Sequence, residues 1–193
     1  VMTASSLSVC IAGAGSIGCF VGGCLASGGH RVALLARPQI CDAIAAHGLR
    51  LTGYEGMDKL IPADRLTLSD DPAILHHADV VLVTVKGGDT AAIADLIAAH
   101  ARPDAIAISL QNGVDNLGLL RDRLPGRTVL GGMVPFNVLA RGGGHYHRAT
   151  SGDIVLEDDF SHLFERLSVP LLKMLPTRDI AGVQWGKLII NLN

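Results

Sequence analysis

Three glycines near the N-terminus, Gly13, Gly15 and Gly18, have the spacing G-x-G-x-x-G. The short apolar run 7–12 precedes them, and a stretch rich in alanine, glycine and leucine, 17–27, follows them. This order predicts a strand, a tight turn and a helix, which is the context in which the motif binds the pyrophosphate of a dinucleotide. A glycine-rich turn without a ligand is the weaker alternative, because spacing and flanking elements agree.

Each residue of this turn has a physical role in such a site. Gly13 permits the tight turn, Gly15 lets the phosphates approach the backbone, and Gly18 lets helix and strand pack closely. The first helical residues, Ser16 and Ile17, offer N–H groups that no carbonyl of the helix accepts, and such groups bind phosphate. We therefore expect all five residues to bind the cofactor.

Arg37 follows the predicted strand 31–36, where an NAD-selective domain usually presents an Asp or Glu to the ribose 2′-hydroxyl. The local sequence is Ala36-Arg37-Pro38-Gln39, and it has no carboxylate nearby. A guanidinium at this position can pair with the 2′-phosphate of NADP and stack on adenine. The sequence therefore predicts NADP(H) as the cofactor. The alternative is that Arg37 is a solvated loop charge.

Two further strand ends carry polar residues. Lys86 follows the apolar run 79–85, and Asn112 follows the predicted strand 105–110. The carboxyl ends of parallel strands form the ligand-binding edge of an open α/β sheet, so we expect Lys86 to bind the cofactor. A solvated lysine at a helix start is the alternative for Lys86. Asn112 either orients a substrate or catalytic group, or caps the helix that follows it.

The last segment of the chain carries a lysine and an asparagine four residues apart, Lys187 and Asn191. On a helix they lie one turn apart and face the same way, while Leu188, Ile189 and Leu192 form a packing face. A lysine among such apolar neighbours is a candidate general acid with a lowered pKa. By spacing alone, an ordinary lysine with its charged end in solvent is favoured.

The elements that must position these residues alternate between strand and helix. We expect helices at 17–27, 39–47, at 89–101 and around Leu117, after the strands 7–12, 31–36, 79–85 and 105–110. The nearly continuous apolar run 79–85 is typical of a central parallel strand that is covered on both faces. This alternation predicts the α/β class, with a Rossmann-type doubly wound parallel sheet.

The second part of the chain has a different pattern. Short strand-like pieces separated by glycines occupy 128–157, and we expect a β-meander at the edge of the main sheet. A helix is predicted over 160–175, closed by Pro176, and a last amphipathic helix begins near Ala181.

Composition and charge exclude several functions. The 193 residues carry a formal net charge of −2 without a basic stripe, so nucleic acid is not expected as a partner. The chain has neither a membrane-spanning run nor a signal peptide at its start, and a cytoplasmic location is expected. The four cysteines lack zinc-site and redox-motif spacing and are expected to be small buried hydrophobes: Cys10, Cys19, Cys24 and Cys41.

Two histidine pairs invite a metal-site interpretation. His145 and His147 would face the same way on a strand, and His76 and His77 are adjacent. A metal site needs at least three convergent ligands, and no third ligand accompanies either pair. We expect packing or surface histidines and no metal.

The chain resembles the ketopantoate reductase (2-dehydropantoate 2-reductase) family in several separated motifs. The order and spacing of these motifs are specific, while any one of them alone is not. They are the turn Gly13 to Gly18, Val83-Thr84-Val85-Lys86, Gln111-Asn112-Gly113, Gly152-Asp153-Ile154-Val155-Leu156 and Trp185-x-Lys187-x-x-x-Asn191.

The resemblance implies NADPH-dependent reduction of ketopantoate to pantoate, in pantothenate and coenzyme A biosynthesis. It implies that Lys187 is the general acid that protonates the keto oxygen, that Asn112 orients this lysine and the substrate, and that Asn191 hydrogen-bonds the substrate. A reductase of another small 2-keto acid and a non-catalytic NADP-sensing module are the alternatives. The substrate is thus expected to be a small keto acid.

The resemblance also implies two domains. Residues 1–178 would form the NADP-binding Rossmann domain, and 179–193 the first helix of a truncated helical domain for substrate binding and dimerisation. Family members continue into that domain, so a homodimer is expected for the full-length protein only. We expect the 193-residue chain by itself to bind cofactor poorly and to have little reductase activity.

Overall fold

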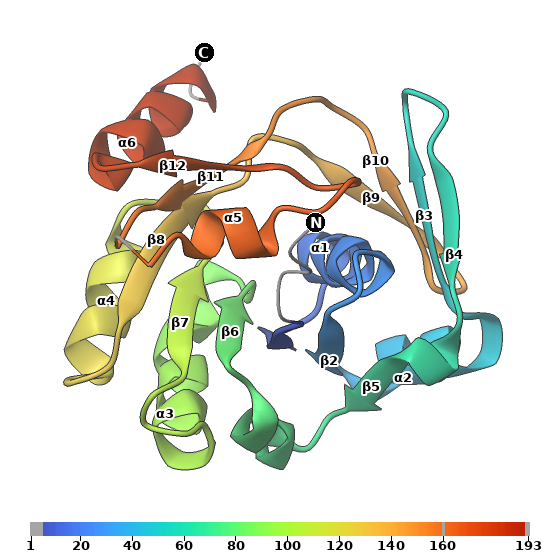
Figure 1. The fold of residues 1–193 in the computed structure, drawn as a ribbon, viewed down its shortest axis with the longest axis horizontal. Helices are drawn as coiled ribbons and strands as arrows, with labels where there is room; N and C mark the ends of the chain where they lie inside the picture. Colours follow the sequence, from blue (N-terminus) through green and yellow to red (C-terminus); the bar gives the residue numbers. More distant parts are fainter. Residues whose placement is uncertain (1–5, 160, 192–193) are drawn as a thin grey trace.

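The computed structural model describes residues 6–159 and 161–191, and an eight-stranded sheet forms the centre of this part of the chain (Figure 1). The strand order is β12-β11-β8-β7-β6-β1-β2-β5, and every neighbouring pair is parallel except β8 with β11. The strands are β1 (Ser8–Ala12), β2 (Arg31–Leu35), β5 (Leu66–Ser69), β6 (Val80–Val83), β7 (Ile106–Ser109), β8 (Val129–Met133), β11 (Ile154–Glu157) and β12 (Met174–Thr177).

Helices cover both faces of this sheet, and the predicted Rossmann-type fold is confirmed. The α-helices are α1 (Ser16–Ser27), α2 (Pro38–His47), α3 (Thr90–His100), α4 (Asp115–Arg123), α5 (Leu163–Leu167) and α6 (Ile180–Asn191). Short 3₁₀ turns are η1 (Ala63–Arg65), η2 (Pro72–His77) and η3 (Gly87–Asp89). Alternate residues of β1 enter different cores: Val9 and Ile11 pack with α1, while Cys10 and Ala12 pack with the residues of α3 and α4. Burial on both faces explains the continuous apolar runs of these strands.

The position of β1 determines where this type of fold forms a ligand-binding crevice. The chain leaves β1 through α1 to β2 on one side, and β6 pairs with β1 on the other side. The strand order therefore reverses at the carboxyl end of β1. In open α/β sheets, ligands bind outside the carboxyl ends of the strands at this switch point. The glycine turn at 13–15 lies there.

A second, four-stranded sheet covers the outer side of α1 (Figure 1). Its order is β4-β3-β10-β9, formed by β3 (Leu49–Gly53), β4 (Asp58–Ile61), β9 (Val138–Gly142) and β10 (His145–Arg148). Small residues let α1 fit between the two sheets. A Cβ on Gly22 would lie 2.8 Å from Leu34 of the main sheet, and one on Gly23 would lie 2.9 Å from Leu49 and Leu51 of the second sheet. Larger side chains would force the layers apart.

The expected meander over 128–157 is corrected in part. Its first and last pieces, β8 and β11, do extend the main sheet, but β9 and β10 pair with each other in the second sheet, where β10 also pairs with β3. The sequence analysis predicted no strands in 49–61, where β3 and β4 lie. The main sheet was therefore the only expected pairing partner for the segments that form β9 and β10. An exposed strand edge pairs with whatever edge the fold brings near, which local sequence does not specify.

The predicted helix over 160–175 is wrong. The structure has one short helix, α5, then an isolated bridge between Val169 and Leu172, and then strand β12. Pro170 explains the break, because proline removes a helical hydrogen bond and disfavours helix at the residue before it. Pro176 lies in β12, which forms an edge of the sheet, where a missing N–H is tolerated.

Three of the four cysteines agree with the prediction of small buried hydrophobes, and Cys41 agrees only in part. Cys10, Cys19 and Cys24 are buried and Cys41 is half-buried, and none of the four forms a disulfide. Burial raises the thiol pKa of Cys10 and Cys24 to about 12 and that of Cys19 to about 11. They therefore remain neutral thiols at physiological pH. Separately, no helix in the described residues is long and apolar enough to cross a membrane.

Candidate functional site

The glycine turn is held between two strands. The N–H groups of Gly13 and Ala14 both donate to the carbonyl of Leu35 at the end of β2, at 3.0 and 2.9 Å. On the other side, the Thr84 hydroxyl, just after β6, donates to the carbonyl of Gly13 at 2.9 Å. Gly13 has a φ of +83°, a conformation that glycine adopts without strain. The turn is therefore fixed before any ligand binds.

The three motif glycines differ in what surrounds them. A Cβ on Gly13 would lie 2.1 Å from Val85 Cγ1, and one on Gly18 would lie 2.5 Å from the Thr84 hydroxyl and 2.8 Å from Ile11 Cγ2. Apart from its own chain neighbours, a Cβ on Gly15 would meet no atom of the described residues within 4 Å. Gly13 and Gly18 are thus required by packing inside the protein, whereas Gly15 keeps space open in front of the helix N-terminus.

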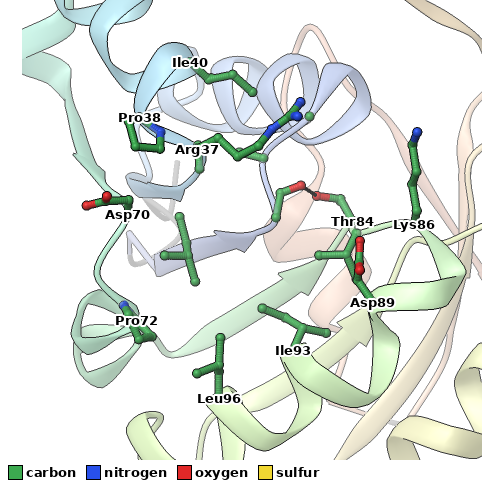
Figure 2. A pocket seen from close by; sticks show the side chains of 16 residues that line it. Arg37, Pro38, Ile40, Asp70, Pro72, Thr84, Lys86, Asp89, Ile93 and Leu96 are labelled. Carbon is green, nitrogen blue, oxygen red and sulfur yellow. Dashed lines mark hydrogen bonds between the residues drawn. The ribbon is translucent and has the colours of Figure 1, made fainter.

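A cavity of about 600 Å³ opens next to this turn (Figure 2). Four of the residues predicted to bind cofactor line it: Gly13, Gly15, Arg37 and Lys86. Apolar side chains form much of its remaining wall: Leu35, Pro38, Ile40, Pro72, Val85, Ile93 and Leu96. Ser16, Ile17 and Gly18 do not line it; they form the first turn of α1, whose N–H groups lack acceptors within the helix.

Arg37 and Lys86 enter the cavity from different elements. Arg37 is the residue before α2 and extends across the wall of the cavity in Figure 2. Lys86 precedes η3 and stands at the opposite side of the cavity from Pro72. Both side chains are exposed. Two cations beside a helix N-terminus form a favourable site for a ligand with several phosphates.

One inference from the local sequence needs correction. No carboxylate was expected near the end of β2, but the cavity is also lined by Asp70 and Asp89. Asp70 follows β5, which pairs with β2, and Asp89 precedes α3. Strand pairing brings Asp70 to the edge that carries Arg37, although the two are far apart in sequence. The structure therefore gives the cavity both signs of charge, with Asp70 on the side of Pro38 and Asp89 beside Thr84 and Lys86 (Figure 2).

A smaller cavity, of about 50 Å³, brings the two predicted catalytic residues together. Lys187 from α6 and Asn112 from the end of β7 both line it, together with Gln111, Gly113, Met133, Gln184 and Leu188. Lys187 Nζ donates to Asn112 Oδ1 at 2.6 Å and to the carbonyl of Val134. Partial burial lowers the pKa of the Lys187 ammonium below its ordinary value. Lys187 is thus half-buried, oriented by two acceptors and adjacent to open space.

Buried polar side chains connect the two cavities, and the sequence interpretation missed them. Gln111 is buried, and its amide Nε2 donates to the Val85 carbonyl at 3.1 Å and to the Thr90 hydroxyl at 2.8 Å. The Thr90 hydroxyl lies 2.9 Å from Asn116 Oδ1, and Asn116 Nδ2 donates to the Asn112 carbonyl at 2.7 Å. This chain of contacts joins the backbone next to Lys86 to the backbone of Asn112. For Gln111, the available signal was its position directly after the predicted apolar strand 105–110, whereas Thr90 and Asn116 have no such signal.

The remaining predicted site residue is Asn191. It is the last residue of α6, and its side chain lies outside the described part of the structure. Its predicted substrate contact therefore stays a prediction.

The histidines do not form a metal site within the described residues. His145 Nε2 and His147 Nδ1 each lie 2.8 Å from the hydroxyl of Thr52, so this pair is satisfied by a side chain of β3. His76 and His77 pack edge to face. In residues 6–159 and 161–191, no group of three or more His, Cys, Asp or Glu side chains could hold a metal.

Comparison with known proteins gives consistent results. The family model for ketopantoate reductase PanE/ApbA matches residues 9–159. The 2-dehydropantoate 2-reductase of Halobacterium salinarum is 34% identical over 127 residues, which cover 65% of this chain and 41% of the relative. The enzyme of the same name from Archaeoglobus fulgidus is 29% identical over 189 residues, which cover 94% of this chain and 60% of the relative.

A solved structure supports the same relationship. The crystal structure of a PanE/ApbA family ketopantoate reductase from Ralstonia eutropha JMP134 superposes with a TM-score of 0.87 at 35% identity, covering 96% of this chain and 61% of that one. The chain therefore spans about 40 to 60% of the length of these relatives.

Proposed function

The chain belongs to the ketopantoate reductase family PanE/ApbA, and we propose that it binds NADP(H) and carries the general acid for reduction of 2-dehydropantoate to pantoate. The observation that carries this proposal is the hydrogen bond from Lys187 to Asn112 at the carboxyl edge of the sheet that also holds the glycine turn. The half-buried ammonium group of Lys187, held by two acceptors beside a cavity, supports the role of a proton donor over that of a solvated lysine.

The proposed chemistry follows from charge. NADPH, when bound, supplies a hydride to the keto carbon of the substrate. Lys187 donates a proton from Nζ to the keto oxygen as negative charge develops there, so the carbonyl becomes a hydroxyl group. Asn112 Oδ1 and the Val134 carbonyl hold the ammonium group in place. A positioned cation that also donates a proton stabilises this transition state in two ways.

The cofactor would occupy the larger cavity. The first turn of α1 and Lys86 would bind the pyrophosphate, and Arg37 would pair with the 2′-phosphate, which favours NADPH over NADH. Gly15 leaves the required space, because its missing Cβ opens the approach to the helix N-terminus. These residue roles are proposals that rest on the arrangement of charges around the cavity.

Two glycine variants separate packing from ligand binding. We expect Gly18→Ala to lower the free energy of unfolding by about 1–3 kcal/mol, because its methyl group would overlap Thr84 and Ile11. Gly15→Ala should leave stability unchanged, since Gly15 has an extended conformation that alanine adopts and no atom nearby. It should weaken NADPH binding about tenfold or more, because the added methyl group would overlap the phosphates of the bound cofactor.

Thermal unfolding and calorimetric titration with NADPH measure the two effects separately. The assignment of Gly15 to phosphate binding would be wrong if Gly15→Ala bound NADPH as tightly as the unchanged protein.

The activity itself is tested by NADPH oxidation in the presence of 2-dehydropantoate. We expect turnover by the complete gene product, with a panel of other small 2-keto acids as comparison. Faster turnover of another keto acid would assign the chain to a related reductase. Tight NADPH binding without turnover of any keto acid would indicate a sensing module.

The pH dependence of the reaction is expected to report the Lys187 pKa. The protonated form is the active one, so kcat/KM should fall as pH rises through the lowered pKa of Lys187. Asn112 Oδ1 accepts from the ammonium group and favours its charged form. Asn112→Ala should therefore shift the alkaline limb to lower pH, and Asn112→Asp should shift it to higher pH, each by about one unit.

A pH–rate profile of kcat/KM for the three proteins provides the measurement. The position of the limb is compared, and not the height of the plateau, because either substitution can also affect substrate binding. An alkaline limb at the same pH in all three proteins would exclude Lys187 as the titrating acid.

We also propose that the domain boundary lies near 178, as the resemblance implies, with 179–193 beginning a second domain. The support is the exposure of large apolar side chains on α6: Trp185 is 53% exposed, Ile189 58% and Ile190 74%. Such a helix face is typical of a surface that another element covers. The cytoplasmic location, the homodimer and the absence of a nucleic-acid partner stay predictions.

A further inference from the structure

Asp70 lies at one end of the larger cavity, and the proposed mechanism does not use it. It comes directly after β5, whose last residue, Ser69, is paired with Leu35 of β2 and accepts a hydrogen bond from the Ala36 N–H at 3.0 Å. This pairing fixes the backbone of Asp70 beside Ala36 and Arg37, the residues between β2 and α2. Asp70 is exposed, and its carboxylate has no hydrogen-bond or ion-pair partner among the described residues.

The ends of the cavity differ in chemistry. At one end, the Thr84 hydroxyl donates a hydrogen bond to the carbonyl of Gly13 in the glycine turn, and Lys86 and Asp89 stand nearby (Figure 2). Asp70 lies on the opposite side, next to Pro38 and Pro72. The first end fits phosphates, because it joins a helix N-terminus to a cation. The dinucleotide has a base on each side of the pyrophosphate, and its nicotinamide would have to reach the substrate beside Lys187. The opposite end of the cavity would therefore receive the other base, adenine.

The walls near Asp70 suit a flat heteroaromatic ring. Pro38 and Ile40 from α2, Pro72 from η2 and Leu96 from α3 present apolar surface to the cavity. Ligand sites of this kind use apolar walls for affinity and a few polar groups for orientation and specificity. Asp70 is the acidic side chain at this end, which it shares with the cationic Arg37, and an ionised carboxylate can only accept hydrogen bonds.

The parts of the dinucleotide differ in whether they offer Asp70 a hydrogen-bond donor. A 2′-phosphate offers no donor at neutral pH and is repelled by a carboxylate, so Asp70 cannot be its partner. The exocyclic amino group of adenine is a donor at the edge of the ring. Hypoxanthine differs from adenine by a carbonyl oxygen at this position, which would face the carboxylate as a second acceptor.

We propose that Asp70 selects adenine as the base of the bound dinucleotide, by accepting a hydrogen bond from its exocyclic amino group. This inference rests on the proposed dinucleotide binding. Two residues of one cavity would then determine cofactor specificity: Arg37 recognises the 2′-phosphate and Asp70 recognises the base.

The test compares NADPH with reduced nicotinamide hypoxanthine dinucleotide phosphate, by calorimetric titration of the complete gene product. The unchanged protein should bind NADPH about fivefold to tenfold more tightly than the hypoxanthine analogue, as expected for one partly exposed, charge-assisted hydrogen bond. In Asp70→Asn the ratio should fall to within about twofold, because an amide can accept from adenine or donate to hypoxanthine.

Asp71→Asn is the matched control. The Asp71 carboxylate accepts from the Ala73 N–H at 2.9 Å and does not line the cavity, and an asparagine can make the same contact. This variant should keep the original base preference.

The outcomes separate the two proposals. Failure to bind either dinucleotide would overturn the proposed function. Binding of both with an unchanged base preference in Asp70→Asn would overturn the role of Asp70 alone. A change in the ratio of NADPH to NADH affinity without a change in base preference would place Asp70 at the ribose, and would also overturn the inference.

Discussion

Lys187→Ala is expected to lower kcat for 2-dehydropantoate reduction by about 10²- to 10⁴-fold, the usual contribution of a general acid. The expected size follows from what Lys187 does in the structure: its ammonium group is half-buried, and two oxygen acceptors, from Asn112 and Val134, hold it. NADPH affinity should change little, because Lys187 does not line the larger cavity. Steady-state kinetics together with calorimetric titration of NADPH measure both quantities.

Lys173→Ala provides the control for this prediction. Lys173 is an exposed lysine that lines neither cavity, so its removal changes the charge of the protein by the same amount. It should leave kcat unchanged. A loss of less than tenfold in Lys187→Ala, with correct folding, would contradict the assignment of Lys187 as the general acid.

Arg37→Ala is expected to reduce the preference for NADPH over NADH by about tenfold, since Arg37 is exposed and a charge-assisted contact there is at the lower end of its usual contribution. NADPH should bind more weakly in this variant, while NADH, which has no 2′-phosphate, should bind about as before. The dissociation constants of both dinucleotides give the ratio directly, at low and at physiological salt, because the contact is electrostatic.

The control for Arg37 is Arg141→Ala. Arg141 lies in β9 of the second sheet, is exposed and does not line the larger cavity. Its removal tests whether a general loss of positive charge weakens NADPH binding. Equal affinities for NADPH and NADH in the unchanged protein would refute the role of Arg37 at the 2′-phosphate.

Much of the first half of the fold could be predicted from the sequence. The strands around 7–12, 31–36, 79–85 and 105–110 and the helices between them occur within a few residues of their expected positions. Local signals define these elements: continuous apolar runs for buried strands and apolar residues at helical spacing for helices. The glycine turn, Arg37 and Lys86 follow directly from strand ends, so they could be assigned to one edge without coordinates.

The prediction failed where pairing partners are distant in sequence. β9 and β10 join β3 and β4, about ninety residues earlier, and no local pattern specifies which edge a short strand meets. The failure at 160–175 has a local cause, because Pro170 interrupts an apolar spacing that otherwise favours a helix.

The sequence by itself determined the glycine turn, the basic residue after the second strand and the lysine of the last helix, because each depends on residue type and short-range spacing. Only the tertiary structure decided which of these residues meet. The hydrogen bond from Lys187 to Asn112 joins residues that are 75 positions apart in the sequence. Strand pairing and helix packing likewise determine the positions of Gln111, Thr90 and Asp70. The physical reason is that one edge of a parallel sheet collects side chains from distant segments, and sheet order, which is a property of the whole fold, determines which segments are neighbours.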